Sequence, residues 1–397
     1  MKSIFWISLA VVLYTYAGYP ILIAALARLY PRPWLRARWP ANTQPPISII
    51  MAVHNGAAML PAKIDHLLAL DPTLVRELIV VSDGSTDATP NILRNAASPR
   101  MIPIVLDQHA GKAEAVNQGI AAAQGDILLF VDIRPRIAPG ALTELLSNFA
   151  DPTVGCVAGE LVLDTVGHDA TAAAVSGLYW RYEQGIRNCE AEFDSPVGVY
   201  GGFYAVRRTL ATRAPKGIIL DDMFQPLSVI GQGYRSVLDR TAIVVDRWPA
   251  KAAGEFDRKV RTLAGNFQLI GLAPWILTPR NRVLLQLVSH KLLRLVVPYL
   301  FLLLIMSSAF LGLHSIPFAT FAIAQTAFWL MAAAALKIRI PILHRIASPA
   351  SALLVLNAAA VAGLYTYLFT RGPLWKIWLP TLVPADNHLF SQKHTQS

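Results

Sequence analysis

Four long apolar runs constrain this chain more than any other feature of its sequence. Residues 4–27 contain no charged side chain, and three further runs follow near the C-terminus, at residues 295–313, 316–336 and 347–370. A helix needs about 20 apolar residues to cross the hydrocarbon core of a bilayer. The sequence therefore predicts one N-terminal transmembrane helix and three C-terminal ones.

The composition supports a membrane protein and gives no reason to expect a nucleic-acid partner. Hydrophobic residues make up 54% of the chain and charged residues 15%, whereas an ordinary soluble domain is about 25% charged. The formal net charge is +10. Many of the basic residues flank the apolar runs, where they orient helices in a membrane and face its lipid headgroups. We therefore expect membrane lipid as a partner, and no nucleic acid.

The basic residues beside the runs also predict the orientation of the helices. Arg28, Arg32, Arg36 and Arg38 follow the first run at once, whereas the loop between the second and third runs has no Lys or Arg. Because loops rich in Lys and Arg stay on the cytoplasmic side, we expect a multi-pass protein of a bacterial inner (cytoplasmic) membrane, with the long segment between the first and second runs in the cytoplasm. The alternative for the first run is a cleaved signal peptide. Its length and the basic residues after it favour a retained helix.

These patterns divide the chain into five segments. They are a transmembrane helix (residues 1–28), a cytoplasmic α/β domain (45–254), amphipathic interfacial helices (255–294), three transmembrane helices (295–371) and a tail (372–397). The interfacial segment is predicted because it mixes basic residues with Phe267, Leu269 and Trp275, a combination typical of helices at a membrane surface.

Within the α/β domain, short apolar runs alternate with helical patterns. The predicted strands are residues 47–53, 77–82, 102–106 and 126–131, and the predicted helices are 60–70, 88–97, 112–124 and 140–149. A continuous apolar, β-branched run such as 47–53 is typical of a strand that is buried on both faces. The alternation predicts a doubly wound, mostly parallel sheet, which binds its ligands beyond the carboxyl ends of its strands.

Polar turns follow three of these strands, at the edge where such a sheet binds ligands. His54 and Asn55 follow the first strand, Asp83 follows the second, and Asp132 with Arg134 follows the fourth. A carboxylate there can bind a ribose hydroxyl or a base edge, and a second can hold a divalent cation on a diphosphate. One such turn alone is an ordinary Asp or Gly turn. Three at successive strand ends predict a nucleotide site.

Lys112 is a further candidate for phosphate binding. It opens the predicted helix 112–124 directly after Gly111. The free N–H groups of a helix start and a lysine ammonium both attract phosphate. The alternative is a solvated lysine at the start of a helix.

A series of motifs in this domain resembles the inverting family 2 glycosyltransferases with the GT-A fold, the group of the cellulose, hyaluronan, chitin-oligosaccharide and poly-N-acetylglucosamine synthases. In chain order, over residues 46–268, the motifs are PPISIIMAVHNG, VVSDGSTDAT, GKAEAVNQG, GDILLFVDIR, GGFYAVRR, LDDMFQPLSVIGQGYR and FDRKVRTLAGN. Each is weak alone, but the ordered series is highly specific. The resemblance implies a GT-A sheet, transmembrane helices and hexosyltransferase activity.

The resemblance implies a role for each residue that matches a family motif. Asp83 matches the aspartate that contacts uracil and ribose, and Asp132 matches the first aspartate of the DxD metal motif. Asp222 matches the general base, and Asp221 stands where the family has a glutamate. Arg261 matches the arginine of the QxxRW motif, which faces the diphosphate. We therefore expect a nucleotide-sugar donor, and by resemblance a UDP-sugar.

Two departures from the family motifs change what we expect of the site. Arg134 replaces the second carboxylate of DxD, so Asp132 is the one expected ligand for Mg²⁺ or Mn²⁺, and the guanidinium can face the diphosphate itself. In QxxRW, Arg258 replaces the glutamine and Thr262 replaces the tryptophan that is associated with acceptor binding in the processive synthases. Three other tryptophans are candidates for an aromatic platform: Trp180, Trp248 and Trp275.

The chemistry that these residues predict is a displacement at the anomeric carbon of the donor sugar. Asp222 is the expected base, and like-charge repulsion from Asp221 raises its pKa. The groups expected to stabilise the departing diphosphate are Lys112, Arg134, Arg258, Arg261 and a divalent cation. The alternative for the aspartate pair is an N-cap of the predicted helix 223–230. For Arg258 and Arg261 it is the basic face of a membrane-surface helix.

The predicted function is sugar transfer from a nucleotide sugar to a saccharide acceptor, in the synthesis of an exopolysaccharide or cell-envelope glycan. The altered QxxRW motif favours an alternative, a single addition to a membrane lipid such as a polyprenyl phosphate or a glycolipid. A nucleotidyltransferase is a third hypothesis, but such enzymes have a Gly-rich loop with a downstream Lys where this chain has His54, Asn55 and Gly56. A non-catalytic membrane scaffold is the fourth.

Overall fold

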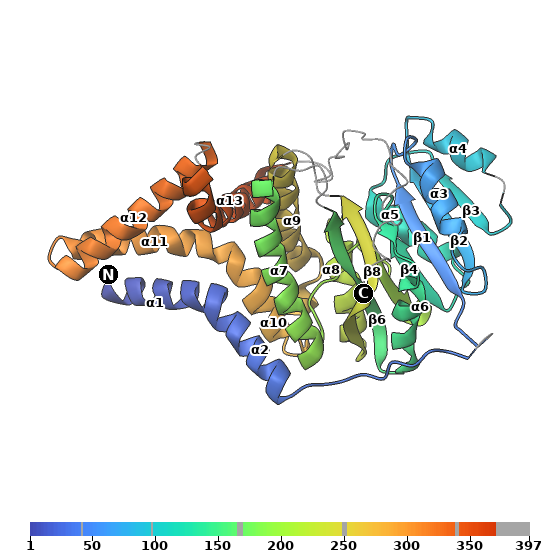
Figure 1. Cartoon of the computed structure of the whole chain (residues 1–397), viewed down its shortest axis with the longest axis horizontal. Helices are drawn as coiled ribbons and strands as arrows, with labels where there is room; N and C mark the ends of the chain where they lie inside the picture. Colours follow the sequence, from blue (N-terminus) through green and yellow to red (C-terminus); the bar gives the residue numbers. More distant parts are fainter. Residues whose placement is uncertain (41–42, 97, 165–169, 248–251, 338–340, 371–397) are drawn as a thin grey trace.

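The computed structural model describes residues 1–40, 43–96, 98–164, 170–247, 252–337 and 341–370. Trp248 and the predicted tail lie outside the described residues. Figure 1 shows the α/β domain at one end of the molecule and long helices at the other, with α7 (Ala170–Phe193) and α9 (Ala252–Leu272) between them.

An eight-stranded sheet forms the core of the α/β domain, in the order β3-β2-β1-β4-β7-β6-β8-β5. The strands are β1 (Ile47–Val53), β2 (Val75–Asp83), β3 (Met101–Leu106), β4 (Ile127–Val131), β5 (Arg136–Ile137), β6 (Val154–Asp164), β7 (Phe203–Arg207) and β8 (Arg235–Arg247). The four strands from β3 to β4 are parallel, which confirms the predicted sheet. β7 runs antiparallel to both β4 and β6, β8 is parallel to β6, and β5 is antiparallel to β8. No strand after residue 131 was predicted.

Helices bury both faces of this sheet. α3 (Leu60–Leu68), α4 (Thr89–Asn95) and α6 (Ala141–Ser147) contribute to the hydrophobic cluster on one face, and α5 (Lys112–Ala122) and α8 (Asp221–Gly231) contribute to the other. Alternate residues of β1 enter opposite clusters: Ile49 and Met51 one, Ile50 the other. Burial on both sides explains why β1 reads as an unbroken apolar run. The part of the chain that the structure describes also contains three short 3₁₀ turns: η2 (Asn148–Ala150), η3 (Arg208–Leu210) and η4 (Pro274–Leu277).

Four helical stretches among the described residues are long and apolar enough to cross a membrane: Lys2–Leu29, Leu284–Gly312, Ile316–Leu336 and Pro349–Phe369. The first consists of α1 (Lys2–Leu13), η1 (Tyr14–Gly18) and α2 (Tyr19–Leu29), and the second of α10 (Leu284–Gln286), η5 (Leu287–Leu292) and α11 (Leu293–Gly312). The third and fourth lie in α12 (Ile316–Lys337) and α13 (Pro341–Phe369). The predicted boundary at residue 295 therefore falls inside a continuous helical stretch. The sidedness of the helices stays a prediction.

A buried histidine connects α7 to the second of these stretches. His290, in the π-helical turn η5, contacts Glu190 Oε1 through Nδ1 at 2.8 Å and Glu183 Oε1 through Nε2 at 2.8 Å. Its side chain and that of Glu190 have no solvent exposure, and Glu183 is 7% exposed. Each ring nitrogen therefore faces a carboxylate oxygen, so the histidine bridges two buried glutamates of α7.

A tyrosine and two basic residues complete this contact. Tyr19 of α2 donates to Glu190 at 2.6 Å, and Glu183 accepts from Lys291 Nζ at 2.7 Å and from Arg294 Nη1 at 2.6 Å. Buried charges are tolerated when they are paired and hydrogen-bonded in this way. We call Tyr19, Glu183, Glu190, His290, Lys291 and Arg294 the His290 cluster. It fixes α7 against two of the apolar helical stretches.

The substitution His290→Ala tests this docking. We expect it to reduce the free energy of unfolding by about 3–5 kcal/mol, because two buried carboxylates lose a shared partner. The measurement is the Tm of the purified protein in detergent. The matched control is His314→Ala, since His314 is exposed between α11 and α12. An unchanged Tm for His290→Ala would show that the cluster does not hold α7 in place.

Candidate active site

The polar residues predicted from the strand ends lie along one edge of the sheet. Asp83 ends β2, Asp132 follows β4, and Lys112 begins α5. Asp221 and Asp222 form the first turn of α8. The parallel strands β1, β2 and β4 deliver their carboxyl ends to this edge, where open α/β sheets bind ligands.

Asp83 lies at the centre of one group of contacts. Its carboxylate accepts from the backbone N–H groups of Ala110 at 2.7 Å and Gly111 at 3.0 Å, and His109 Nδ1 lies 2.9 Å from its Oδ2. His54 Nδ1 contacts the Asp83 carbonyl oxygen, and the rings of His54 and His109 lie 4.4 Å apart. Two imidazole rings and a buried carboxylate thus gather at the end of β2.

Gly84 permits this close arrangement. Its φ is +56°, and a Cβ at this position would lie 2.1 Å from the backbone nitrogen of His109. Only glycine adopts this conformation without strain and leaves room for the neighbouring chain. The turn after β2 therefore presses directly against the turn after β3.

Asn55 has a structural role in the turn after β2. Its side-chain oxygen accepts from the N–H groups of Thr86 at 2.8 Å and Asp87 at 3.3 Å, and its own N–H donates to Ser85 Oγ. Asp87 in turn accepts from Ala57 N and Thr89 N. The predicted donor-binding residue Asn55 thus holds the turn after β2 in shape, with its amide oxygen already engaged.

Lys112 joins the ends of three elements. Its Nζ lies 3.1 Å from Asp132 Oδ1, at the end of β4, and 3.6 Å from Asp221 Oδ2, at the start of α8. Burial alone would lower the pKa of Lys112, but the charges of Asp132, Asp221 and Asp222 outweigh this effect and raise it. The ammonium is therefore firmly charged. With 24% of the Lys112 side chain and 41% of the Asp132 side chain exposed, the pair stays open to a ligand.

The surroundings of Asp222 raise the pKa of its carboxyl group. Burial, followed by the charge of Asp221, raises its pKa to about 6, against the opposing effect of Lys112 and Arg187. A Cβ on Gly201 would lie 3.1 Å from Asp222 Oδ2, so a larger residue at this position would crowd the carboxylate. The capping residue of α8 is Leu220, and it makes no side-chain cap bond. The aspartates occupy the first turn instead, where the helix dipole favours anions.

Arg134 has a partner that the sequence did not reveal. Its Nη2 lies 3.0 Å from Asp246 Oδ2, near the end of β8, and Tyr200 donates a hydrogen bond to the same oxygen at 3.2 Å. Lys63 of α3 is buried nearby and donates to the Pro135 carbonyl. Burial lowers the pKa of Lys63 to about 8, an effect that Asp132 and Asp246 partly offset. The guanidinium is thus held in place by Asp246, two residues along the chain from Asp132.

Arg261 also lies within the field of these carboxylates, from α9. Burial, together with the charge of Arg258, lowers its pKa, and Asp222, Asp132 and Asp221 oppose that shift. Arg258 is exposed one turn away on the same helix. α9 packs against α13, so the helix that carries these arginines belongs both to the site and to the apolar helices.

The expected divalent cation can be tested against the side chains at Asp132. Among the described residues, one group of three potential ligands has its donor atoms within 4.8 Å of one another: His54, Asp83 and His109. It does not include Asp132. At Asp132 one oxygen faces the Lys112 ammonium, and Arg134 stands where the family has its second carboxylate. A hard divalent ion selects oxygen ligands, so this cation-rich set does not fit one.

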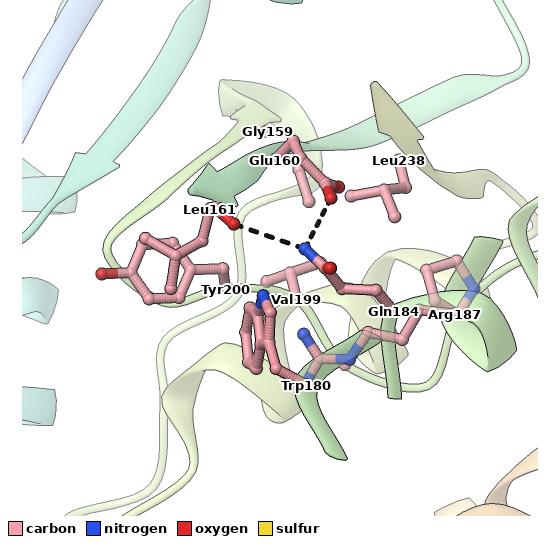
Figure 2. Close-up of a pocket in the computed structure, with 12 residues that line it drawn as sticks. Gly159, Glu160, Leu161, Trp180, Gln184, Arg187, Val199, Tyr200 and Leu238 are labelled. Carbon is pink, nitrogen blue, oxygen red and sulfur yellow. Dashed lines mark hydrogen bonds between the residues drawn. The ribbon is translucent and has the colours of Figure 1, made fainter. Parts of the chain in front are cut away.

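A small pocket lies between β6, α7 and residues 196–200. Figure 2 shows Gln184 of α7 donating to Glu160 and to the Leu161 carbonyl, with Trp180 and Tyr200 next to them. The same loop reaches Asp222, whose carbonyl accepts from Val199 N at 3.1 Å. Of the candidate tryptophans, Trp180 lines this pocket, and Trp275 packs near Gly231 on the outside of α8.

Four residues of the site were missed by the sequence reasoning: Lys63, His109, Tyr200 and Asp246. His109 follows β3 in a polar turn, so the rule that found Asp83 would also have found it. Lys63 stands three residues after Leu60 in an apolar helical stripe, and Asp246 lies in a strand that was not predicted. Neither of these two has a local signal.

Comparisons with known proteins agree with this geometry. Residues 48–211 match the family described as Glycosyl transferase family 2. The chain is 32% identical over 104 residues to the succinoglycan biosynthesis protein ExoO of Rhizobium meliloti (strain 1021). The matched segment covers 26% of this chain and 30% of that protein. It is 30% identical over 115 residues to the poly-beta-1,6-N-acetyl-D-glucosamine synthase of Staphylococcus aureus (strain COL), 28% of each chain. The matched segments thus span about a third or less of these relatives.

The fold has a solved counterpart over nearly its whole length. The mannosyltransferase PcManGT from Pyrobaculum calidifontis, determined in complex with GDP-Man and Mn²⁺, aligns with a TM-score of 0.67 and 20% identity over 92% of this chain and 99% of that one. At this identity the likeness concerns the fold. Residues 48–211 therefore match a glycosyltransferase family 2 domain, in a chain that has the GT-A fold and, among its described residues, four helices long and apolar enough to cross a membrane.

Proposed function

We propose that this protein transfers a sugar from a nucleotide-sugar donor to a saccharide hydroxyl, with inversion at the anomeric carbon. The observation that carries the proposal is the partly buried Asp222, with its pKa raised to about 6, beside the charged pair of Lys112 and Asp132. A base and a cationic anion-binding group side by side are what such a displacement requires. The names of the relatives support a role in polysaccharide synthesis.

In this mechanism the acceptor oxygen attacks the anomeric carbon as the bond from that carbon to the diphosphate breaks. The proton of the acceptor hydroxyl passes to Asp222, and the nucleoside diphosphate departs with the bonding electron pair. Because a carboxylate is a weak base for a hydroxyl, proton transfer comes late, as the new bond forms. The departing charge is met by Lys112, Arg261 and Arg134.

The donor would bind with its base at β2 and its phosphates at α5. Asp83 and the rings of His54 and His109 form the end of the site suited to a uracil and its ribose, by the resemblance. Lys112, Arg258 and Arg261 surround the diphosphate. We propose a UDP-sugar donor on this basis, and a cytoplasmic site on a bacterial inner membrane because of the basic residues that follow the first apolar helix.

A single addition to a lipid-linked acceptor is the second candidate. The observation that favours it is Thr262, which stands at the tryptophan position of QxxRW and hydrogen-bonds the Arg258 carbonyl within α9. An aromatic platform for a growing chain is absent at that position. Product size with radiolabelled nucleotide sugar separates the two: a ladder or long polymer contradicts single addition, and one radiolabelled lipid product contradicts polymerisation.

The substitution Asp222→Asn tests the assignment of the base. We expect transfer to fall by about 10²- to 10⁴-fold, the usual contribution of a general base, while nucleotide binding persists. The measurement is transfer of radiolabelled sugar from a panel of nucleotide sugars, with UDP binding measured in parallel. The control is Asp65→Asn, on the exposed side of α3. Retained turnover in Asp222→Asn would refute the role of Asp222.

The pH dependence of transfer gives an independent test. Asp222 must be ionised to accept a proton, so activity should fall as the pH drops through about 6, the raised pKa of Asp222. Removing the neighbouring charge in Asp221→Asn should lower that pKa and move the acidic limb of the kcat/KM profile to lower pH. An acidic limb that stays in place in this variant would mean that a different group titrates.

A further inference from the structure

The side chains around Asp132 already supply the positive charge that a divalent ion provides at such sites. Lys112 Nζ lies 3.1 Å from Asp132 Oδ1 and 3.6 Å from Asp221 Oδ2. Arg134 stands two residues after Asp132 and is held by Asp246 at 3.0 Å. These cations are fixed by the fold before any ligand arrives, so they need no reorganisation to meet a diphosphate.

We infer that Lys112 and Arg134 replace the divalent cation in this protein, so that it binds a nucleoside diphosphate without metal. The inference rests on the proposed function and concerns the same site. It also gives a reason for the exchange of an acidic residue for Arg134. A carboxylate there would complete a metal site, whereas a guanidinium repels a metal ion and presents a fork of donors that suits phosphate oxygens.

The positions of Asp246 and Tyr200 support this role for Arg134. A guanidinium two residues from Asp132 would otherwise be drawn to that carboxylate and neutralise it. Asp246, which is 7% exposed, accepts hydrogen bonds from both Arg134 and Tyr200 through one oxygen. The Arg134 side chain remains 32% exposed. It is therefore anchored by Asp246 and partly exposed to solvent.

The ammonium of Lys112 is suited to occupy the place of a metal ion beside Asp132. Its charge is secured by three carboxylates, and it begins α5, where free backbone N–H groups add to the attraction for phosphate. A divalent ion at Asp132 would have to displace this ammonium from a carboxylate oxygen and would lie next to two fixed cations. Repulsion between like charges at such short range opposes that exchange.

The test measures binding of UDP and GDP to the full-length wild-type protein, by calorimetry in detergent, in EDTA and in excess Mn²⁺. We expect the Kd of the bound nucleotide to agree within about twofold between the two conditions. A loss of affinity of about tenfold or more in EDTA would overturn the inference and leave the proposed function standing. Failure of both nucleotides to bind in either condition would overturn both.

Two sets of variants sharpen the result. Lys112→Ala should weaken metal-free UDP binding by about tenfold or more, whereas Lys216→Ala, which removes an exposed lysine, should leave it unchanged. Arg134→Asp restores the carboxylate pair, and we expect its UDP affinity to rise about tenfold with Mn²⁺. Because this variant places a carboxylate beside buried Asp246, the double variant Arg134→Asp with Asp246→Asn is measured as well. A metal-independent affinity in both folded variants would contradict the role of Arg134.

Discussion

The ammonium of Lys112 is the group on which the arrangement of the site depends. It is the shared counter-charge of carboxylates that come from the end of β4 and the start of α8. Without it, Asp132, Asp221 and Asp222 would repel one another in a partly buried space. The lysine also begins α5, so the same contact fixes the start of a helix that packs against β1 and β2.

This charge also separates the roles of the two adjacent aspartates. Asp221 faces the ammonium, whereas Asp222 lies against Gly201, and burial together with the charge of Asp221 raises its pKa to about 6. Neighbouring carboxylates in different surroundings are a common feature of sites that carry out acid–base chemistry. The surroundings of Asp222 depend on neighbouring elements that stay in place. One of these elements is α7, whose Arg187 acts on Asp222 through its charge. The His290 cluster anchors α7 to the apolar helices.

The sequence predicted the first half of the sheet, β1 to β4, closely because its signals are local. The run at 47–53 is β1, and the expected helix at 112–124 corresponds to α5, Lys112–Ala122. The positions of Asp83 and Asp132 at the ligand-binding edge followed from strand direction alone. The second half of the sheet was harder to predict. β6 and β8 are long and pair with each other across many intervening residues, so no short window of sequence defines them.

The sequence by itself determined the apolar helices, the alternation of strands and helices, and which polar residues stand at strand ends, since each depends on neighbours a few residues away. Only the tertiary structure decided the partners of the charged groups. Arg134 meets Asp246 from 112 residues away, and His290 meets Glu190 from 100 residues away. The first contact exists because β8 lies on the same side of β4 as β7 and β6. The second exists because α7 packs against the apolar helices. At such a buried contact, water cannot take the place of a missing partner, so the charged groups must be paired with each other.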